Sequence, residues 1–183
     1  MTIPSSASTD DLDPAQLQGA SLVGAQQLLK PLVLPDSHQS ETALFVARGT
    51  RRLLRRLNFS TVTELPLLSG RRADIVALAM DATILIVEIK SSIADFRADT
   101  KWRDYRAHCD KLFFATPETV PIEIMPDDAG LILADAYSAE ILREAPEHRI
   151  APSTRRAMLI RFANAAAHRL HCLSDPEVVT QGR

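Results

Sequence analysis

Three charged side chains stand in a stretch that is otherwise mostly apolar, residues 70–92 (GRRADIVALAMDATILIVEIKSS). Asp74 lies near the start of this stretch, and Glu88 and Lys90 lie near its end. Charged groups are costly to bury unless they pair or hold a metal. Two carboxylates suit Mg²⁺ or Mn²⁺, and a neighbouring lysine can orient a water or offset an anionic transition state. The three residues therefore predict a metal site that hydrolyses phosphodiester bonds.

The same residues also fit two plainer arrangements. Glu88 and Lys90 could form an ordinary ion pair at an exposed strand end, and all three charges could form a buried ion network with no role in nucleic-acid chemistry. An Asp followed by Glu-x-Lys arises often by accident, so the spacing alone leaves these alternatives open.

Two strands must position the charges, because residues 73–80 and 83–90 are nearly all apolar, as strands in the middle of a sheet are. Glu88 and Lys90 are two residues apart and share a face of the second strand. A two-residue turn at 81–82 would place Asp74 opposite Ile89, pointing away from Glu88. Convergence of the carboxylates requires a three-residue loop at 80–82, a bulge, or a bend near Asp74.

A helix is predicted over residues 40–57, with Ser40 as its N-cap and an apolar face of Phe45, Val46, Gly49, Leu53 and Leu57. A second stripe beside that face carries Glu41, Arg48, Arg52 and Arg55. Guanidinium groups can bind phosphate oxygens through two hydrogen bonds, so this stripe could contact a nucleic-acid backbone. A basic helix face exposed to solvent would explain the same spacing equally well. Two further arginines, Arg71 and Arg72, precede Asp74 and add to the basic charge.

The remaining elements predict an α/β fold around a mixed sheet. A strand over 60–68 precedes the central hairpin, and a helix of two to three turns capped by Asp99 follows it, with Lys101, Trp102 and Tyr105. Strands are predicted at 111–116 and 130–135, with a third possible at 139–144. A terminal helix runs from Ser153 and is predicted to direct Met158, Leu159, Phe162, Ala166 and Leu170 inward. The order is then helix, three strands, helix, two strands, helix.

Composition and charge limit the classes of protein that the chain can represent. Residues 1–36 are predicted to be a disordered or loosely packed tail, 37–173 a single domain, and 174–183 a loose tail. The net charge of −2 gives no overall signal for nucleic acid, so any such signal must be local. Cys109 and Cys172 form no metal-binding or redox motif. With no membrane-spanning or signal-peptide pattern, a cytoplasmic location is expected.

Four longer motifs resemble a known family. The segments GRRADIVAL, IVEIKSSIADFRAD, KWRDYRAHCDKLFFA and GLILADAYSAEILRE are similar to the MmcB family of DNA-repair proteins, over about residues 40–173. Asp on one strand and Glu-x-Lys on the next also resemble the PD-(D/E)xK nuclease superfamily. The resemblance implies a restriction-endonuclease-like αβββαβ core, a mixed sheet flanked by helices, with an extra C-terminal helix.

The resemblance also implies roles for individual residues. Asp74 and Glu88 would ligate Mg²⁺ or Mn²⁺, Glu41 would serve as an outer or third ligand, and Lys90 would act on the water. Lys101 and Tyr105 are placed like the Q-x-x-x-Y pair of RecB-type nucleases, with lysine in place of glutamine. Ala73 stands where the superfamily motif has proline. The residues expected to contact DNA are Arg48, Arg52, Arg55, Arg71, Arg72, Ser91, Lys101 and Tyr105.

These residues predict a metal-dependent deoxyribonuclease of DNA repair, acting on duplex or branched DNA. The alternative is a DNA-binding module of the same fold that does not cut and works with a partner repair protein. Resolvase-like relatives act as dimers, which makes a homodimer conceivable here, and no membrane association is expected.

Overall fold

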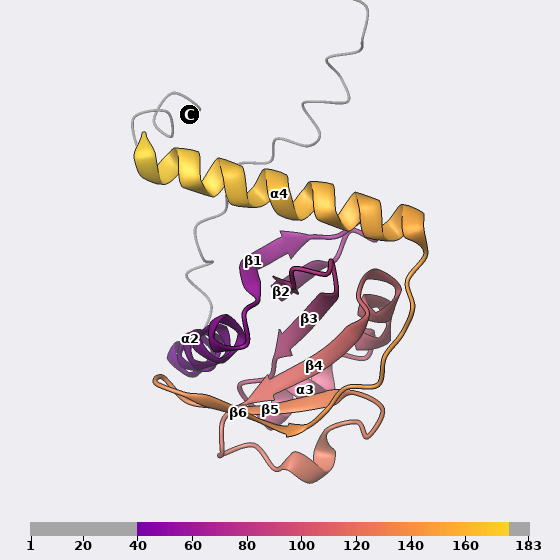
Figure 1. Ribbon diagram of the computed structural model, residues 1–183. Helices are drawn as coiled ribbons and strands as arrows, with labels where there is room; N and C mark the ends of the chain where they lie inside the picture. The colour runs from indigo at the N-terminus through magenta and orange to yellow at the C-terminus, as the bar shows by residue number, and fades with distance from the viewer. Residues whose placement is uncertain (1–39, 176–183) are drawn as a thin grey trace, which may run out of the picture. The chain divides into compact units, whose positions relative to one another are not determined.

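The computed structural model describes residues 40–175, which form one six-stranded sheet and its flanking helices (Figure 1). The strands follow the order β1-β2-β3-β4-β5-β6 across the sheet. Pairs β1–β2, β2–β3 and β5–β6 are antiparallel, while β3–β4 and β4–β5 are parallel. The elements in chain order are α2 (Glu41–Arg56), β1 (Ser60–Pro66), β2 (Arg72–Leu78), β3 (Ile84–Ile89), α3 (Ile93–Ala98), the 3-10 helix η2 (Trp102–His108), β4 (Lys111–Thr116), the 3-10 helix η3 (Ile122–Ile124), β5 (Gly130–Ala134), β6 (Ala139–Arg143) and α4 (Pro152–Ser174).

This architecture confirms the predicted α/β class, the mixed sheet and the C-terminal helix. The prediction for residues 1–36, and that for the tail beyond Asp175, lie outside the described residues. No helix within residues 40–175 is long and apolar enough to cross a membrane.

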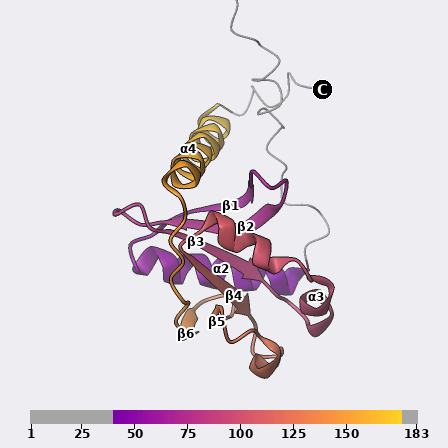
Figure 2. The same ribbon diagram turned by 90° about the vertical axis from the view of Figure 1, so that its right-hand side faces the viewer.

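Two apolar cores lie on opposite faces of the sheet, because the strands of its centre bury both faces. Helix α2 covers one face, where Val46 and Leu54 pack with Ile75 and Val87. The other face carries Ile86 and Phe114, together with the buried side chains of η2 and of the first turns of α4. Figure 2 shows α2 and α4 on opposite sides of the sheet, and Figure 1 shows α4 along its β1 edge. Side chains of β3 therefore alternate between the two cores.

The β2–β3 hairpin turns through a three-residue loop, Met80–Ala82. The backbone N–H of Ala79 donates to the carbonyl of Thr83 at 3.0 Å, and Ala82 takes a positive φ of 66°. The strand pairs from Leu78–Ile84 to Ile75–Val87 follow from this loop. Continuing the same register places Asp74 opposite Glu88 rather than opposite Ile89, as the convergence of the carboxylates required.

The helical elements differ from prediction in three places. The helix expected from Asp99 is instead the 3-10 helix η2, and a short helix that was not predicted, α3, capped by Ser92, ends before Asp99. A 3-10 helix has three residues per turn, so Trp102, Tyr105 and His108 share its buried face and Lys101 is exposed. In α4, Met158 and Phe162 are buried as expected, but Leu170 is 67% exposed. The buried face of α2 is rotated, with Phe45 and Leu57 exposed and Thr50 and Leu54 buried.

Candidate functional site

Asp74 and Glu88 meet where β2 and β3 stop pairing through their backbones. The last backbone pair before this end is Ile75–Val87. Beyond it, the backbone N–H of Asp74 donates to Glu88 Oε1 at 3.3 Å, and the N–H of Ile89 donates to Asp74 Oδ2 at 2.8 Å. The two side chains thus take the place of ladder hydrogen bonds, and each carboxylate is held at a fixed position beside the other strand.

Neither carboxylate is well suited to carry its charge in this environment. Glu88 is 3% exposed, whereas Asp74 is partly exposed. Burial raises the pKa of Asp74 to about 6, against a smaller opposing effect of the Ile89 N–H. Burial, and then the charge of Asp74, raises the pKa of Glu88 well above its ordinary value. Each ionised carboxylate disfavours ionisation of the other. A bound cation would offset this repulsion.

Lys90 lies on the same face of the sheet as Glu88 and is 4% exposed. Its ammonium group donates to Asp99 Oδ2 at 2.7 Å and lies 6.0 Å from the centre of the Phe114 ring. The charge of Lys90 lowers the pKa of both Asp74 and Glu88, so the ammonium is close to both. The structure therefore brings together the three residues predicted to be catalytic, and it adds Asp99 as the partner of the lysine.

Tyr105 closes the site from η2. Its hydroxyl donates to the Arg72 carbonyl at 3.2 Å, and the position of this hydroxyl near Glu88 lowers the pKa of that carboxyl. Burial, followed by the charge of Glu88, raises the pKa of Tyr105, so the hydroxyl keeps its proton. Tyr105, predicted to contact DNA together with Lys101, has its hydroxyl on the Arg72 carbonyl, while Lys101 is exposed and lies outside the buried face of η2.

The other predicted residues near the pair have partners within the protein. Arg71 Nε pairs with Asp104 Oδ2 at 2.9 Å and stacks over the Tyr105 ring, and Arg72 pairs with Glu64. The hydroxyl and backbone N–H of Ser91 both donate to Asp95 Oδ2, at 3.3 and 3.0 Å. These contacts show that Arg71, Arg72 and Ser91 help to order the site.

Sequence reasoning missed three acids close to the pair. The charges of Glu64 and Asp95 both raise the pKa of Asp74, and Asp99 holds Lys90. Glu64 has a positive φ of 50° and stands between the pairs Thr63–Ile75 and Leu65–Ala73, an irregular point of the β1–β2 ladder. It is the single acid in the basic segment between Arg48 and Arg72, a signal that could have identified it.

The chemistry of the donor set fits one divalent cation held by two carboxylates. Mg²⁺ commonly takes one or two protein carboxylates and completes its shell with water and phosphate oxygens. Within residues 40–175, no three His, Cys, Asp or Glu side chains come together in a way that could hold a metal ion. Glu41 lies exposed in the first turn of α2 and is not brought into a cluster with Asp74 and Glu88. Two of the three predicted ligands thus meet.

The arginine stripe of α2 lies away from the acidic pair. Arg48, Arg52 and Arg55 are exposed and line an open pocket together with Met80, at the tip of the β2–β3 hairpin. Asp74 is six residues from Met80 along an extended strand, a separation of about 20 Å. Glu88 and Lys90 face the core that α2 does not cover. The predicted backbone-contacting stripe and the predicted catalytic residues are therefore on different faces of the sheet.

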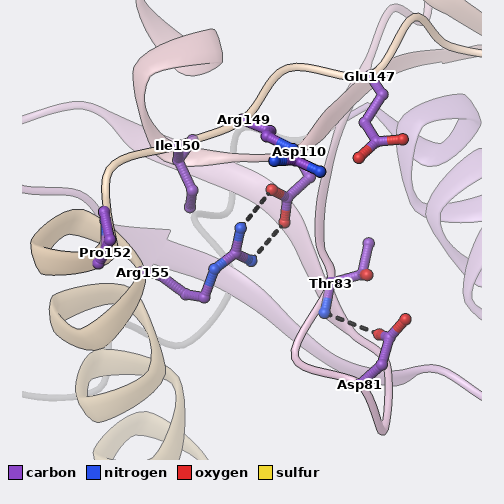
Figure 3. A pocket seen from close by; sticks show the side chains of 8 residues that line it. All are labelled: Asp81, Thr83, Asp110, Glu147, Arg149, Ile150, Pro152 and Arg155. Carbon is purple, nitrogen blue, oxygen red and sulfur yellow. Dashed lines mark hydrogen bonds and ion pairs between the residues drawn. The ribbon is translucent and has the colours of Figure 1, made fainter.

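A second pocket, of ≈ 400 Å³, lies near the same hairpin and is lined mostly by charged residues (Figure 3). Asp110, 4% exposed, accepts two hydrogen bonds from Arg155, at 2.6 and 2.7 Å, and one from the Ile84 N–H at 2.8 Å. Arg155 also donates to the Ala82 carbonyl, so it ties α4 to the hairpin. The most buried charges of this pocket neutralise each other, which indicates a structural role.

Comparisons with known proteins identify the family of the chain and a protein of similar structure. A family model described as DNA repair protein MmcB-like matches residues 30–177. The structure of the SPO1766 protein of unknown function from Silicibacter pomeroyi is similar, with a TM-score of 0.73 and 42% sequence identity. The match covers 76% of this chain and 95% of that one. No protein with a curated description matches the chain.

Proposed function

The chain belongs to the MmcB-like family of DNA repair proteins, and from this premise we propose that it is a divalent-metal-dependent nuclease that hydrolyses DNA phosphodiester bonds. The observation that supports the proposal most strongly is the pairing of Asp74 and Glu88. Their pKa values are raised, and the nearest lysine is held by a different acid, Asp99. The sequence of elements, αβββ, crossover helix, β, also supports a restriction-endonuclease-like core.

Each residue of the site has a role in this proposal. Asp74 and Glu88 would hold Mg²⁺ or Mn²⁺, and Asp74, the more exposed of the two, lies on the side open to a phosphate group. When bound, the cation would lower the pKa of a coordinated water and offset the negative charge that develops on the phosphate. Lys90, fixed by Asp99, would hold the water or a phosphate oxygen through its ammonium.

Tyr105 and the backbone N–H groups act on the carboxylates rather than on the DNA. The Tyr105 hydroxyl and the Asp74 N–H both favour the ionised form of Glu88, which is the form that binds a cation. The Ile89 N–H does the same for Asp74. These positioning contacts keep the pair ready for a cation in spite of burial.

A second candidate function, a DNA-binding module that does not cut, is favoured by two observations. Only two carboxylates of the described residues meet, and the arginine stripe lies on another face of the sheet. Many proteins of one fold keep the scaffold and differ in chemistry, so the fold does not decide between the two.

Cation binding and DNA cleavage test the two candidates together. Binding of Mn²⁺ is measured by titration calorimetry for the unaltered protein, for Asp74→Asn, and for Glu118→Gln as a control at an exposed carboxylate. Cleavage of labelled single-stranded, duplex and branched DNA is then measured with Mg²⁺ or Mn²⁺, adding Lys90→Ala and, as its control, Lys111→Ala.

The nuclease proposal expects Mn²⁺ binding and cleavage by the unaltered protein and by both controls. It expects neither from Asp74→Asn, and it expects binding without cleavage from Lys90→Ala. Mn²⁺ binding without cleavage of any DNA by the unaltered protein would favour the second candidate. Absence of Mn²⁺ binding by the unaltered protein would overturn the metal site itself.

A further inference from the structure

The arginine pocket is formed by Arg48, Arg51, Arg52 and Arg55 of α2 together with Phe59 and Met80, and it is an open hollow of ≈ 630 Å³. We propose that this pocket is a second DNA site, which binds a single-stranded segment of DNA at a place separate from the Asp74–Glu88 pair. The inference rests on DNA as the partner in the proposed function, but it does not depend on cleavage.

Unbalanced positive charge is the first observation that supports this site. Arg48, Arg51 and Arg55 have no carboxylate or hydrogen-bond partner within residues 40–175. Arg52 donates only to two carbonyl groups, those of Ala136 and Tyr137, at 3.1 and 3.2 Å. Like charges three and four residues apart on a helix repel each other, so this arrangement destabilises α2 unless an anion binds there.

Arginines elsewhere in the described chain provide the contrast. Arg71, Arg106, Arg143 and Arg155 are each paired with an aspartate at 2.6 to 3.0 Å. The surplus at the pocket extends to α4, because the pKa of Arg169 is lowered by burial and then by the charge of Arg51. Three unpaired guanidinium groups of the described chain are thus clustered within one pocket, although the net charge of the whole chain is −2.

The apolar residues of the pocket point to a single strand rather than to a duplex. Met80 is 90% exposed at the tip of the hairpin, directly beside the arginines, and Phe59 lines the floor of the same hollow. Unpaired bases expose faces that can stack on apolar side chains and on guanidinium planes, while arginine forks hold the phosphates. A duplex would offer the arginines its phosphates but would leave Met80 without a partner.

The position of the pocket separates it from the proposed cleavage centre. The acidic pair lies about 20 Å away along the hairpin, on the face that α2 does not cover. A straight duplex cannot touch both faces of the sheet at once. A molecule that reaches both sites must carry a flexible or branched strand, and this geometry identifies DNA with single-stranded arms as the substrate class.

DNA binding without divalent cation tests the pocket independently of cleavage. Fluorescence anisotropy with a labelled single strand, in EDTA, compares the unaltered protein with the double variant Arg51→Ala/Arg55→Ala. The control is Arg149→Ala/Arg156→Ala, which removes the same charge from exposed positions outside the pocket. Circular dichroism confirms that both variants fold.

The proposal expects a loss of affinity of roughly tenfold or more for the pocket variant, and a salt slope lower by about 1.4, the change for two lost phosphate contacts on a single strand. The control variant should retain the affinity of the unaltered protein. Equal losses in the pocket and control variants, or no loss in either, would overturn it.

A tethered cutting reagent then tests whether the two sites hold different DNA segments. Iron-EDTA is attached to Met80→Cys, or to Ser92→Cys beside the acidic pair, each in a Cys172→Ser background, since the other cysteine, Cys109, is buried. On a duplex with a single-stranded arm, the Met80 probe should cut the arm and the Ser92 probe should cut elsewhere. Cuts by both probes at the same nucleotides would contradict the separation of the sites.

Discussion

Two acidic residues at opposite ends of β3 differ in whether a positively charged side chain compensates their charge. Asp110, beside the start of β3, receives two hydrogen bonds from Arg155 and one from the Ile84 N–H. Asp74, beside the end of β3, receives one from the Ile89 N–H and faces a second carboxylate, Glu88. The first acid is neutralised by a cation of the protein itself, and the second is not.

The pKa values of the two acids express this difference. Burial acts to raise the pKa of Asp110, but the hydrogen bonds from Arg155 and Ile84 outweigh it and hold the pKa below its ordinary value. Burial raises the pKa of Asp74 to about 6. The contrast teaches that burial alone does not mark a functional acid. A buried acid without a counter-charge does mark a functional site, because selection for stability alone would have placed a positively charged side chain beside it.

The largest effect is expected when the structural pair is broken. Asp110→Ala leaves Arg155 without its counter-charge and the Ile84 N–H without an acceptor, which should lower the free energy of unfolding by about 3 kcal/mol. Urea denaturation measures the change. In Asp127→Ala the lost partner is Arg143, in a pair whose carboxylate is fully exposed, and the free energy of unfolding should not change measurably. Equal effects in both variants would show that Asp110 is not a special structural contact.

An effect of the opposite sign is expected at the acidic pair. Asp74→Asn keeps an oxygen for the Ile89 N–H but removes the charge that repels Glu88. In EDTA at neutral pH, the variant should therefore be more stable than the unaltered protein, by roughly 2 kcal/mol, while Glu118→Gln should be unchanged.

The pH dependence of this difference follows from the raised pKa of Asp74. The folded state binds the proton more tightly than the unfolded chain, so stability falls as the pH rises from about 4, the unfolded pKa, to about 6. The advantage of Asp74→Asn should be complete above this range and absent below it. For Asp110, whose folded pKa is lowered, the contribution is present at neutral pH and is lost on acidification below the unfolded pKa. If Asp74→Asn destabilises the protein at every pH, Asp74 is a structural residue.

The strands could be predicted from the sequence because their apolar runs are long and the loop between them is short. The sequence narrowed the register to a three-residue loop at 80–82, a bulge or a bend near Asp74, and the structure has the three-residue loop. The helix capped by Ser40 was likewise predictable from its cap and its period, and Ser40 Oγ accepts the Ala43 N–H at 3.1 Å. Local patterns determine these features.

Other features depend on contacts that no local pattern encodes. The 3-10 geometry of η2 is set by the burial of Trp102, Tyr105 and His108 against the sheet, which separates Lys101 from Tyr105. The arginine stripe was correctly placed along one edge of α2, but periodicity does not tell which face of the sheet the helix covers. Gly49 shows how specific that docking is, because a Cβ there would lie 2.2 Å from the Asp135 carbonyl oxygen.

The smallest expected effect concerns the hydroxyl of Tyr105, which acts on the acidic pair through Glu88. Tyr105→Phe keeps the ring in the core and removes the hydroxyl, which bonds the Arg72 carbonyl and lowers the pKa of Glu88. Stability should change by about 1 kcal/mol or less, and Mn²⁺ affinity should fall a few-fold at neutral pH, since Glu88 would be protonated more of the time. Titration at higher pH should restore the affinity. Without such a recovery, the role of Tyr105 would be to stabilise the fold, as that of Asp110 is.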